Sequence, residues 1–595
     1  MNRHLTAVAS TLVLGALLST GTQAATPSPL FTRVFPTTAA VPSALFSGGA
    51  TVNGGAGFVT SIPADQKAGI VATLVPAAAD IGKDASIYMV INAGNAWYMR
   101  TPTGFATWNT QVGSLVPYGS AVLAASQTIN VTDLEALAGQ DFDGKTLRVH
   151  VGYQTNTSPL TYGSAIEFAM ASTPASTCPN DGFVGIPPAV AGGKRLCVLS
   201  GTYTKDVHLT NNFEYIVGGP VFFGVDNAQN VTLTIDAGVK TYGESGADFI
   251  RVSRGSKIYV NGTKDAPVIM TGAAEATATA STTGLWGGLV VNGNARVNGC
   301  TEGTALCERT AEGNAGTYGG NNDAESSGTI NYLIVKYAGF EISPGNELNG
   351  ITLNGVGSGT VVDYVQVHNG SDDGFELFGG TVNAKHLVLT GNDDDNVDWQ
   401  TGWRGKIQHV LVLHKSVGDR GIEADNNNAA RDSLPRSKGQ IANMTIIGKS
   451  SNGHGIKLRD GTAANLYNFV VKSAGAGCLD IDHGPTFLNG GSSATALTGE
   501  LTIINSLFDC TNALVFTSGD NWSTPQWFLG QQGNLVGASS MTGYINSATV
   551  NARPAAPLGG DGFFDQVDYI GAVKDAANDW TVGWTFRQPF TTLLP

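Results

Sequence analysis

Apolar and polar residues recur with a long period between residues 361 and 483. Five successive segments each contain a β-branched run, a turn of Gly, Asn, Asp or Ser, a second short run and another turn. The equivalent positions lie 22, 24, 33 and 25 residues apart when the segments are aligned on Val365, Leu387, Leu411, Met444 and Phe469. Short strands at this spacing, without a helical pattern, are typical of a solenoid of stacked β-coils.

The second run of each segment alternates between apolar and charged residues. The apolar positions form two columns: Phe375, Val397, Ile422, Ile456, Leu479, and Leu377, Trp399, Ala424, Leu458, Ile481. The column between them contains Glu376, Asp398, Glu423, Lys457 and Asp480. Residues two apart share one face of a strand, so we expect the apolar columns to point inward and the charged column outward. Because stacked coils lie about 4.8 Å apart, charges distant in sequence should become neighbours.

Short motifs extend the pattern beyond the repeat. They are Leu233-Thr-Ile-Asp-Ala-Gly, Gly255-Ser-Lys-Ile with Gly262-Thr and Pro267-Val-Ile, Trp286-Gly-Gly-Leu-Val-Val-Asn-Gly, Asp395-Asn-Val-Asp-Trp, Arg420-Gly-Ile-Glu-Ala-Asp-Asn, Asp568-Tyr-Ile-Gly-Ala and Asp579-Trp-Thr-Val-Gly-Trp-Thr. In these motifs the chain resembles secreted bacterial proteins of the pectate-lyase-like superfamily. The resemblance implies an all-β protein with a right-handed parallel β-helix over residues 176–515, which residues 516–595 complete and cap.

Residues 25–175 read as a separate β domain, similar to a small sandwich, because strand-like runs alternate with polar turns. Its aromatic residues gather at Trp97, Tyr98, Phe105 and Trp108. Two interpretations are open for this cluster. It forms the core of the sandwich, or it forms an aromatic platform for sugar rings.

The first 24 residues have the pattern of a secretory signal peptide. Arg3 and His4 precede an apolar run from Leu5 to Leu18, and small residues follow around Ala24. No later segment is apolar for 18 or more residues, so we expect an exported protein without a membrane span.

The overall charge argues against one class of partner and points toward another. The formal net charge is −14, and no basic block occurs, so the chain is a poor candidate for binding nucleic acid. It is better suited to holding cations. The six cysteines are an even number, as expected of an exported chain. Their spacing favours the pairs Cys178–Cys197, Cys300–Cys307 and Cys478–Cys510, although six cysteines allow 15 connectivities.

Two long segments interrupt the repeat. Residues 298–328 lack apolar periodicity, and residues 425–440 account for the longest step of the repeat. We expect both to be surface loops that border a groove.

The stacked carboxylates predict a metal site. Glu376, Asp398 and Glu423 would repel one another on adjacent coils unless a cation, a bound proton or basic neighbours compensate. Lys457 and Arg459 can serve the later coils, whereas the earlier coils have no base in line. Ca²⁺ is the hard cation expected there in an exported protein, with the ligands Asp372, Asp373, Glu376, Asp395 and Asp398. The alternative is a solvated ladder with weak ion pairs.

Paired carboxylates also suit carbohydrate chemistry, because glycosidases act with two of them. The Asp394-Asp395 pair and Ser451-Asn-Gly-His-Gly are similar to motifs of the polygalacturonase family. That resemblance implies Asp394 or Asp395 as the acid and His454 as a helper. Lys457 and Arg459 would grip a uronate, or act as the base of a Ca²⁺-dependent lyase, and Glu423 is a further candidate.

The resemblance to the polygalacturonase motifs is incomplete. His454 follows the Asp pair by two coils instead of one, and a structural histidine is the alternative interpretation. We therefore expect an exported surface or matrix protein that binds extracellular polysaccharide or a cell-surface glycan with the help of Ca²⁺. The alternative is a glycoside hydrolase or polysaccharide lyase that uses the same face.

Overall fold

The computed structural model describes residues 28–52, 58–63, 68–131, 145–171, 178, 183–185, 195–301, 304, 306–415, 418–448, 453–560 and 562–587. The chain divides into two compact units, residues 1–196 and 197–595. The predicted signal peptide lies outside the described residues. Within the described part of the chain, no helix has the length and apolar character needed to cross a membrane.

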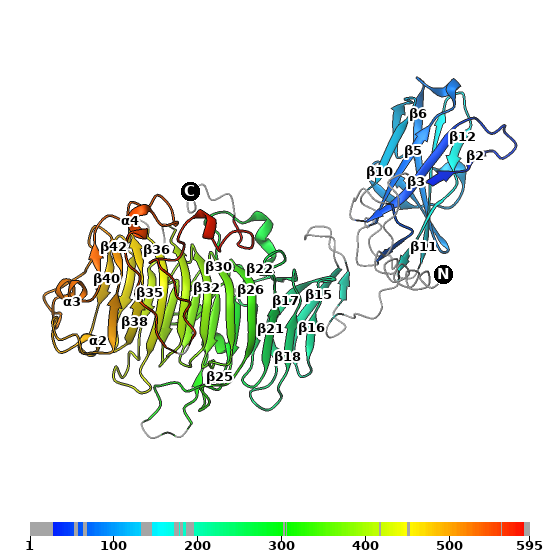
Figure 1. Ribbon diagram of the computed structural model, residues 1–595. Coiled ribbons are helices and arrows are strands. Elements are labelled where there is room, and N and C mark those ends of the chain that lie inside the picture. The colour runs from blue at the N-terminus through cyan, green and yellow to red at the C-terminus, as the bar shows by residue number, and fades with distance from the viewer. Residues whose placement is uncertain are drawn as a thin grey trace, which may run out of the picture. The chain divides into compact units, whose positions relative to one another are not determined.

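The N-terminal unit is a β-sandwich, as predicted (Figure 1). One sheet has the strand order β1 (Ser28–Leu30), β3 (Leu45–Val52), β5 (Ala68–Val75) and β10 (Gln127–Val131). The other has the order β2 (Thr32–Phe35), β12 (Leu160–Gly163), β11 (Thr146–Thr155), β6 (Asp84–Ala93), β7 (Ala96–Thr101) and β8 (Gly104–Thr107), joined by β13 (Ile166–Ala171), β4 (Ser61–Pro63) and β9 (Gly119–Val122). Alternate residues of both sheets, such as Leu74 and Met89, fill the core between them.

The larger unit is a right-handed parallel β-helix, which confirms the predicted fold class (Figure 1). Two strands, β14 (Phe183–Gly185) and β15 (Arg195–Tyr203), begin its sheet. The first coils contain β16 (Val207–Leu209), β17 (Phe213–Phe223), β18 (Thr232–Ile235), β19 (Lys240–Gly243), β20 (Phe249–Val252), β21 (Lys257–Asn261), β22 (Val268–Gly272) and β23 (Gly288–Asn292). The middle coils contain β26 (Gly328–Lys336), β29 (Ile351–Asn354), β30 (Val361–His368), β31 (Phe375–Phe378), β32 (Asn383–Thr390) and β33 (Val397–Gln400).

The later coils continue the same stacking. They contain β34 (Lys406–Leu413), β35 (Arg420–Ala424), β36 (Lys438–Ile447), β37 (His454–Leu458), β38 (Ala463–Tyr467), β39 (Val470–Lys472), β40 (Gly477–Ile481), β41 (Leu501–Ile504), β42 (Leu507–Asp509) and β43 (Leu535–Val536). The helices α2 (Gly484–Gly490), α3 (Thr524–Gly530) and α4 (Ala548–Asn551) follow or interrupt them.

The two predicted apolar columns form the interior of the helix. Phe375 lies beside Val397 and Val397 beside Ile422 in parallel register, and the second column aligns in the same way from Leu377 to Ile481. All ten side chains are at most 1% exposed. The alternation of apolar and charged residues therefore predicted the buried face correctly.

A left-handed residue makes the bend inside each long strand. Tyr332, Tyr364, His386, His409 and Asn443 occupy this position with φ between 48° and 61°. Such φ values are uncommon outside glycine, and Asn and His adopt them more readily than most residues. The rings of Tyr332, Tyr364 and His386 stack on one another with centroids 4.4 and 4.2 Å apart.

The strand register corrects one predicted alignment. Val410, not Leu411, pairs with Leu387 on one side and with Met444 on the other. The true steps from Val365 to Met444 are therefore 22, 23 and 34 residues. The turn before β34 is one residue longer than the turn before β32, and the consecutive apolar residues Val410, Leu411 and Val412 hide this difference.

Residues 541–560 and 562–587 run back along the outside of the coils (Figure 1). Trp584 packs against Ile334 and Val388, and Tyr544 packs against Leu411 and Leu413. Gln366 and the backbone of Phe586 exchange two hydrogen bonds of 2.7 and 3.1 Å. The segment thus covers apolar side chains that would otherwise face solvent.

Disulfides join Cys300 to Cys307 and Cys478 to Cys510, as predicted. Cys178 and Cys197 are also disulfide-bonded. The expectation of a surface loop is wrong for residues 309–318, which we call the covering hairpin. Its strands β24 (Arg309–Thr310) and β25 (Thr317–Tyr318) bracket buried alanines and pack against the sheet. A second hairpin consists of β27 (Phe340–Ser343) and β28 (Asn346–Leu348).

The packing predicts a large difference between inward and outward positions. Ile422→Ala leaves a cavity in the interior column and is expected to cost about 2–5 kcal/mol of unfolding free energy. Val361→Ala removes methyl groups from a side chain that is 53% exposed, so its effect should stay within about 0.5 kcal/mol. Urea unfolding of both variants measures the difference, and equal losses would contradict the placement of this column.

Candidate functional site

The charged column lies on β31, β33, β35, β37 and β40 in the predicted register. Glu376 lies beside Asp398, Asp398 beside Glu423, Glu423 beside Lys457, and Lys457 beside Asp480. The side chains point away from the interior, but none is freely exposed. Their exposed fractions run from 4% for Glu376 to 9% for Lys457, so neighbouring side chains shield them from water.

Basic side chains neutralise the downstream half of the column. Arg420 contacts Asp395 Oδ2 at 3.1 Å and Glu423 Oε1 at 2.6 Å. Arg459 contacts Glu423 Oε2 at 2.5 Å and Asp425 Oδ1 at 3.0 Å. Lys457 is paired with Asp480, and it lies 2.5 Å from Asp482 Oδ2. Burial acts to lower the pKa of Lys457, but the hydrogen bonds from these two carboxylates outweigh it and raise the pKa.

The upstream half has no such neutralisation. Asp373, Glu376 and Asp398, which we call the carboxylate trio, make no ion pair among the described residues. Oxygen atoms of all three lie within 4.8 Å of one another. Asp398 Oδ1 is buried without a hydrogen-bond partner in the described part of the chain. Glu376 accepts hydrogen bonds from the side chains of Asn349 and Gln400.

Burial and crowding favour the protonated state of the carboxylate trio. Burial is the largest cause, and it raises the pKa of each of the three carboxyls well above its ordinary range. The neighbouring carboxylates raise these pKa values further, because each would bring another negative charge close by. The trio therefore needs a proton or a cation.

A second group of carboxylates lies at the turn that precedes these strands. Asp394 is exposed and lies between Asp372 and Asp419, with oxygen atoms of Asp372, Asp373 and Asp394 within 4.8 Å of one another. Burial first and Asp394 second raise the pKa of Asp372 to about 8. This turn therefore holds one protonated and one accessible carboxyl side by side near neutral pH.

The covering hairpin closes the upstream end of this face. Ala311, Ala315 and Tyr318 pack against Phe249 and Phe378 on the outer side of the sheet. Glu312 of the hairpin adds a negative charge near Glu376 and Asp372, and its own pKa is raised to about 7 by burial and by Glu347. The hairpin thus borders the acidic region and adds a further carboxyl group to it.

The loop at residues 425–440 meets the other long segment. Asn298 donates a hydrogen bond to Asn426 Oδ1 at 2.8 Å, and Asn427 donates one to Asn298 Oδ1 at 3.2 Å. Arg431 of the loop pairs with Asp460 at 2.5 Å. These contacts fix the loop beside the downstream half of the charged face.

Ion pairs occupy most of the predicted catalytic residues. Asp395 is 1% exposed and bound to Arg420, whereas Asp394 is open to solvent. Arg420 pairs in register with His454, so it stands between that histidine and Asp395. His454 contacts Asp480 at 3.3 Å, and burial lowers its pKa. Lys457 is paired with Asp482, and Arg459 is paired with Glu423, so these three residues already take part in ion pairs.

The predicted metal ligands fall into three neighbouring groups that share members. Asp373, Glu376 and Asp398 form the carboxylate trio, and Asp372 joins Asp373 and Asp394. Asp395 instead groups with Asp394 and Asp419. Ca²⁺ takes six to eight oxygen ligands, and each carboxylate can supply one or two. The buried, unpartnered oxygen of Asp398 makes the trio a fitting donor set for such a cation.

Three residues of this region were not among the predicted site residues. Arg420 neutralises two carboxylates, and its position one coil after Asp395 could have revealed this role. Asn349 binds the carboxylate of Glu376 and the backbone of Asp373. Glu312 lies in a segment without periodicity, so no signal in the sequence connects it with Glu376.

Comparison with known proteins agrees with the fold. The chain belongs to the family described as pectate-lyase like beta helix domain, whose model matches residues 201–585. A search of curated proteins finds no significant match.

Two solved structures illustrate how distant the similar folds are. One is the catalytic unit of a thermostable GH87 alpha-1,3-glucanase from Streptomyces thermodiastaticus strain HF3-3, with 11% identity, a TM-score of 0.27, and 87% of this chain and 97% of that chain covered. The other is a family 28 exopolygalacturonase from Yersinia enterocolitica, with 11% identity, a TM-score of 0.20, and 84% and 88% covered. Superpositions this remote carry no argument about the site.

The raised pKa values predict how the metal-free protein responds to pH. A carboxyl whose pKa is higher in the folded state stabilises the fold below its unfolded pKa, and this stability is lost as pH rises through the folded pKa. Asp372, with a pKa of about 8 and no basic partner among the described residues, places the end of this loss just above neutral pH. In EDTA, the melting temperature should therefore fall by several degrees from about pH 6.5 to about pH 8.5.

In this pH range the buried histidines do not contribute to the change in melting temperature. Burial lowers the pKa of His368 to about 3 and those of His409 and His414 to about 4, so all three are neutral throughout the range. Asp398→Asn should flatten the pH dependence because it removes one of the crowded charges. A melting temperature that rises with pH in EDTA would contradict the inference that burial and crowding raise the pKa values of these carboxyl groups.

Proposed function

We propose that this protein is an exported carbohydrate-binding protein whose acidic face holds Ca²⁺ and, through it, an acidic polysaccharide. The carboxylate trio carries the proposal, because three buried acids without a base need a proton or a cation, and Ca²⁺ prefers oxygen ligands of this kind. The disulfides and the signal-like leader support export.

The arrangement of charges favours binding over lyase chemistry. The base of a lyase must be deprotonated before it can take a proton from the substrate. Lys457 and Arg459 are instead each held in their charged form by two carboxylates. These contacts raise the pKa of both side chains, although burial alone would lower it. A polyanion can therefore approach the face only where a cation offsets the negative charge of the trio.

Ca²⁺ should stabilise the folded protein. At about 100 times the dissociation constant, the expected gain is about 2.7 kcal/mol, measured as a rise in the midpoint of urea or thermal unfolding that EDTA reverses. Asp398→Asn should abolish this response because it removes one of the three carboxylates of the trio.

Asp482→Asn is the matched control. It is the same substitution on the same face, but Asp482 is partly exposed and paired with Lys457. This variant should keep the full response to Ca²⁺. Identical responses in the two variants, or none in the unmodified protein, would refute the cation site.

An affinity assay tests the polysaccharide. Columns of immobilised polygalacturonate and of a neutral glucan should differ, with retention of the purified protein on the acidic polymer several-fold stronger in Ca²⁺ than in EDTA. This Ca²⁺-dependent part of the retention should disappear in Asp398→Asn and persist in Asp482→Asn. Equal retention on both polymers, or no Ca²⁺ dependence, would overturn the proposal.

One observation favours a polysaccharide-degrading enzyme as the second candidate. Asp372, protonated near neutral pH, lies beside the exposed Asp394, and acid–base pairs of this kind serve glycoside hydrolysis. Analysis of the same incubations for new reducing ends or unsaturated products decides between the two. Product that forms with the unmodified protein, and not with Asp394→Asn, would establish the enzyme.

A further inference from the structure

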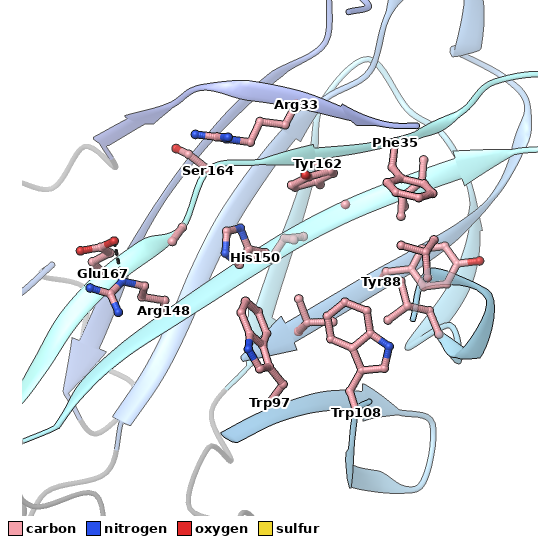
Figure 2. A pocket seen from close by; sticks show the side chains of 17 residues that line it. Arg33, Phe35, Tyr88, Trp97, Trp108, Arg148, His150, Tyr162, Ser164 and Glu167 are labelled. Atoms are coloured by element: carbon pink, nitrogen blue, oxygen red, sulfur yellow. Dashed lines mark hydrogen bonds and ion pairs between the residues drawn. The ribbon is translucent and has the colours of Figure 1, made fainter. Parts of the chain in front are cut away.

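The N-terminal unit contains a cavity on the outer face of its larger sheet. Its volume is about 520 Å³, which lies in the range of pockets for small ligands. Figure 2 shows side chains that line it, and they come from β2, β6, β7, β11, β12 and β13 and from the segments that follow β8 and β12. The opposite face of the same strands forms the core, so the cavity is no part of the hydrophobic interior.

The strand register explains why a hollow exists at this place. Gly152 pairs with Tyr162 on one side and with Tyr88 on the other. A Cβ atom at Gly152 would lie only 2.7 Å from the Cβ atom of Tyr162. The glycine therefore leaves a gap in a row of aromatic side chains, and the rings on both sides become its walls.

Aromatic rings line this hollow in a continuous series. Trp108 and Trp97 meet edge to face with centroids 5.7 Å apart, Trp97 lies 6.2 Å from the ring of His150, and His150 lies 6.1 Å from Tyr162. Both tryptophans are partly exposed although their size favours burial. Exposed aromatic rings that carry a hydrogen-bonding group suit ligands with one apolar face and one hydrated polar face.

Polar groups occupy the opposite end of the cavity (Figure 2). Arg148 Nε donates to Glu167 Oε1 at 2.9 Å, so this pair presents both donors and acceptors. Arg33 lies nearby on β2, and no ion pair to it is found among the described residues. Its charge is the one uncompensated charge of the lining, which gives this pocket a positive sign within an acidic protein.

His150 adds a hydrogen-bond acceptor between the two ends. Its Nδ1 lies 3.2 Å from the carbonyl oxygen of Gly163, which places the ring proton on Nδ1. Burial lowers the pKa of this histidine, so the ring is neutral and Nε2 keeps a lone pair. That lone pair can accept a hydrogen bond from a hydroxyl group.

We propose that this cavity binds an acidic pyranose sugar, such as the uronate at the end of an oligosaccharide. The apolar face of the sugar ring packs on Trp97 and Trp108, His150 and the Arg148–Glu167 pair bind hydroxyl groups, and Arg33 binds the carboxylate. The site is separate from the carboxylate trio and needs no Ca²⁺.

Calorimetry of the full-length protein with trigalacturonate and with neutral galactotriose tests the proposal. In EDTA, which removes Ca²⁺ from the acidic face, trigalacturonate should still bind, and more tightly than galactotriose. Trp97→Ala should weaken binding about tenfold or more, because it removes an aromatic ring from the centre of the site. Arg33→Gln should reduce the affinity for trigalacturonate to that for galactotriose.

Phe31→Ala is the matched control, because this aromatic side chain of the same unit is 81% exposed and outside the cavity. It should leave binding unchanged, as should Asp398→Asn, and equal melting temperatures of all variants show that folding is intact. Binding that survives Trp97→Ala, that fails in EDTA, or that is absent for both trisaccharides would overturn the proposal. Because Asp398→Asn affects the acidic face alone, failure here is distinct from failure of the Ca²⁺ site.

Discussion

The parallel register of the coils is the constraint on which the rest of this structure depends. Each residue of a coil lies one strand spacing, about 4.8 Å, from its counterpart in the next. Inside the helix this repetition is favourable, because Phe375, Val397 and Ile422 extend one apolar column. Outside, the same repetition forces Glu376, Asp398 and Glu423 together, and their charges must be compensated.

The chain compensates these charges in two ways along one face. Downstream, Arg420, Arg459 and Lys457 hold the carboxylates in ion pairs, which fixes the side chains and closes the face to further chemistry. Upstream, the carboxylate trio lacks a base, and the covering hairpin adds Glu312 instead of a cation. On this face, only the upstream carboxylates lack a basic partner among the described residues, and their burial requires a proton or a cation. The aromatic cavity of the N-terminal unit has the complementary character, since it is apolar and carries an uncompensated arginine.

Sequence periodicity predicted regular positions and failed where the backbone departs from regularity. The columns from Phe375 to Asp480 were correct because two-residue alternation directly reports the faces of a strand. Leu411 was wrong by one position because the turn before β34 holds one extra residue, and three consecutive apolar residues, Val410 to Val412, do not reveal which of them faces inward. The aromatic cluster divided along the same principle: Tyr98 faces the core, and its neighbour Trp97 faces the cavity.

Local spacing in the sequence was enough to predict the fold class and the register of the charged column, and it favoured the pairs Cys300–Cys307 and Cys478–Cys510 that the structure contains. The tertiary structure alone decided which carboxylates obtain a basic partner. Arg420 lies between Asp395 and Glu423, and residues 309–318 fold back over the sheet, through contacts between segments that share no period. Burial and the balance of charge are properties of such contacts, so the chemical character of the site emerged only when the coils were stacked.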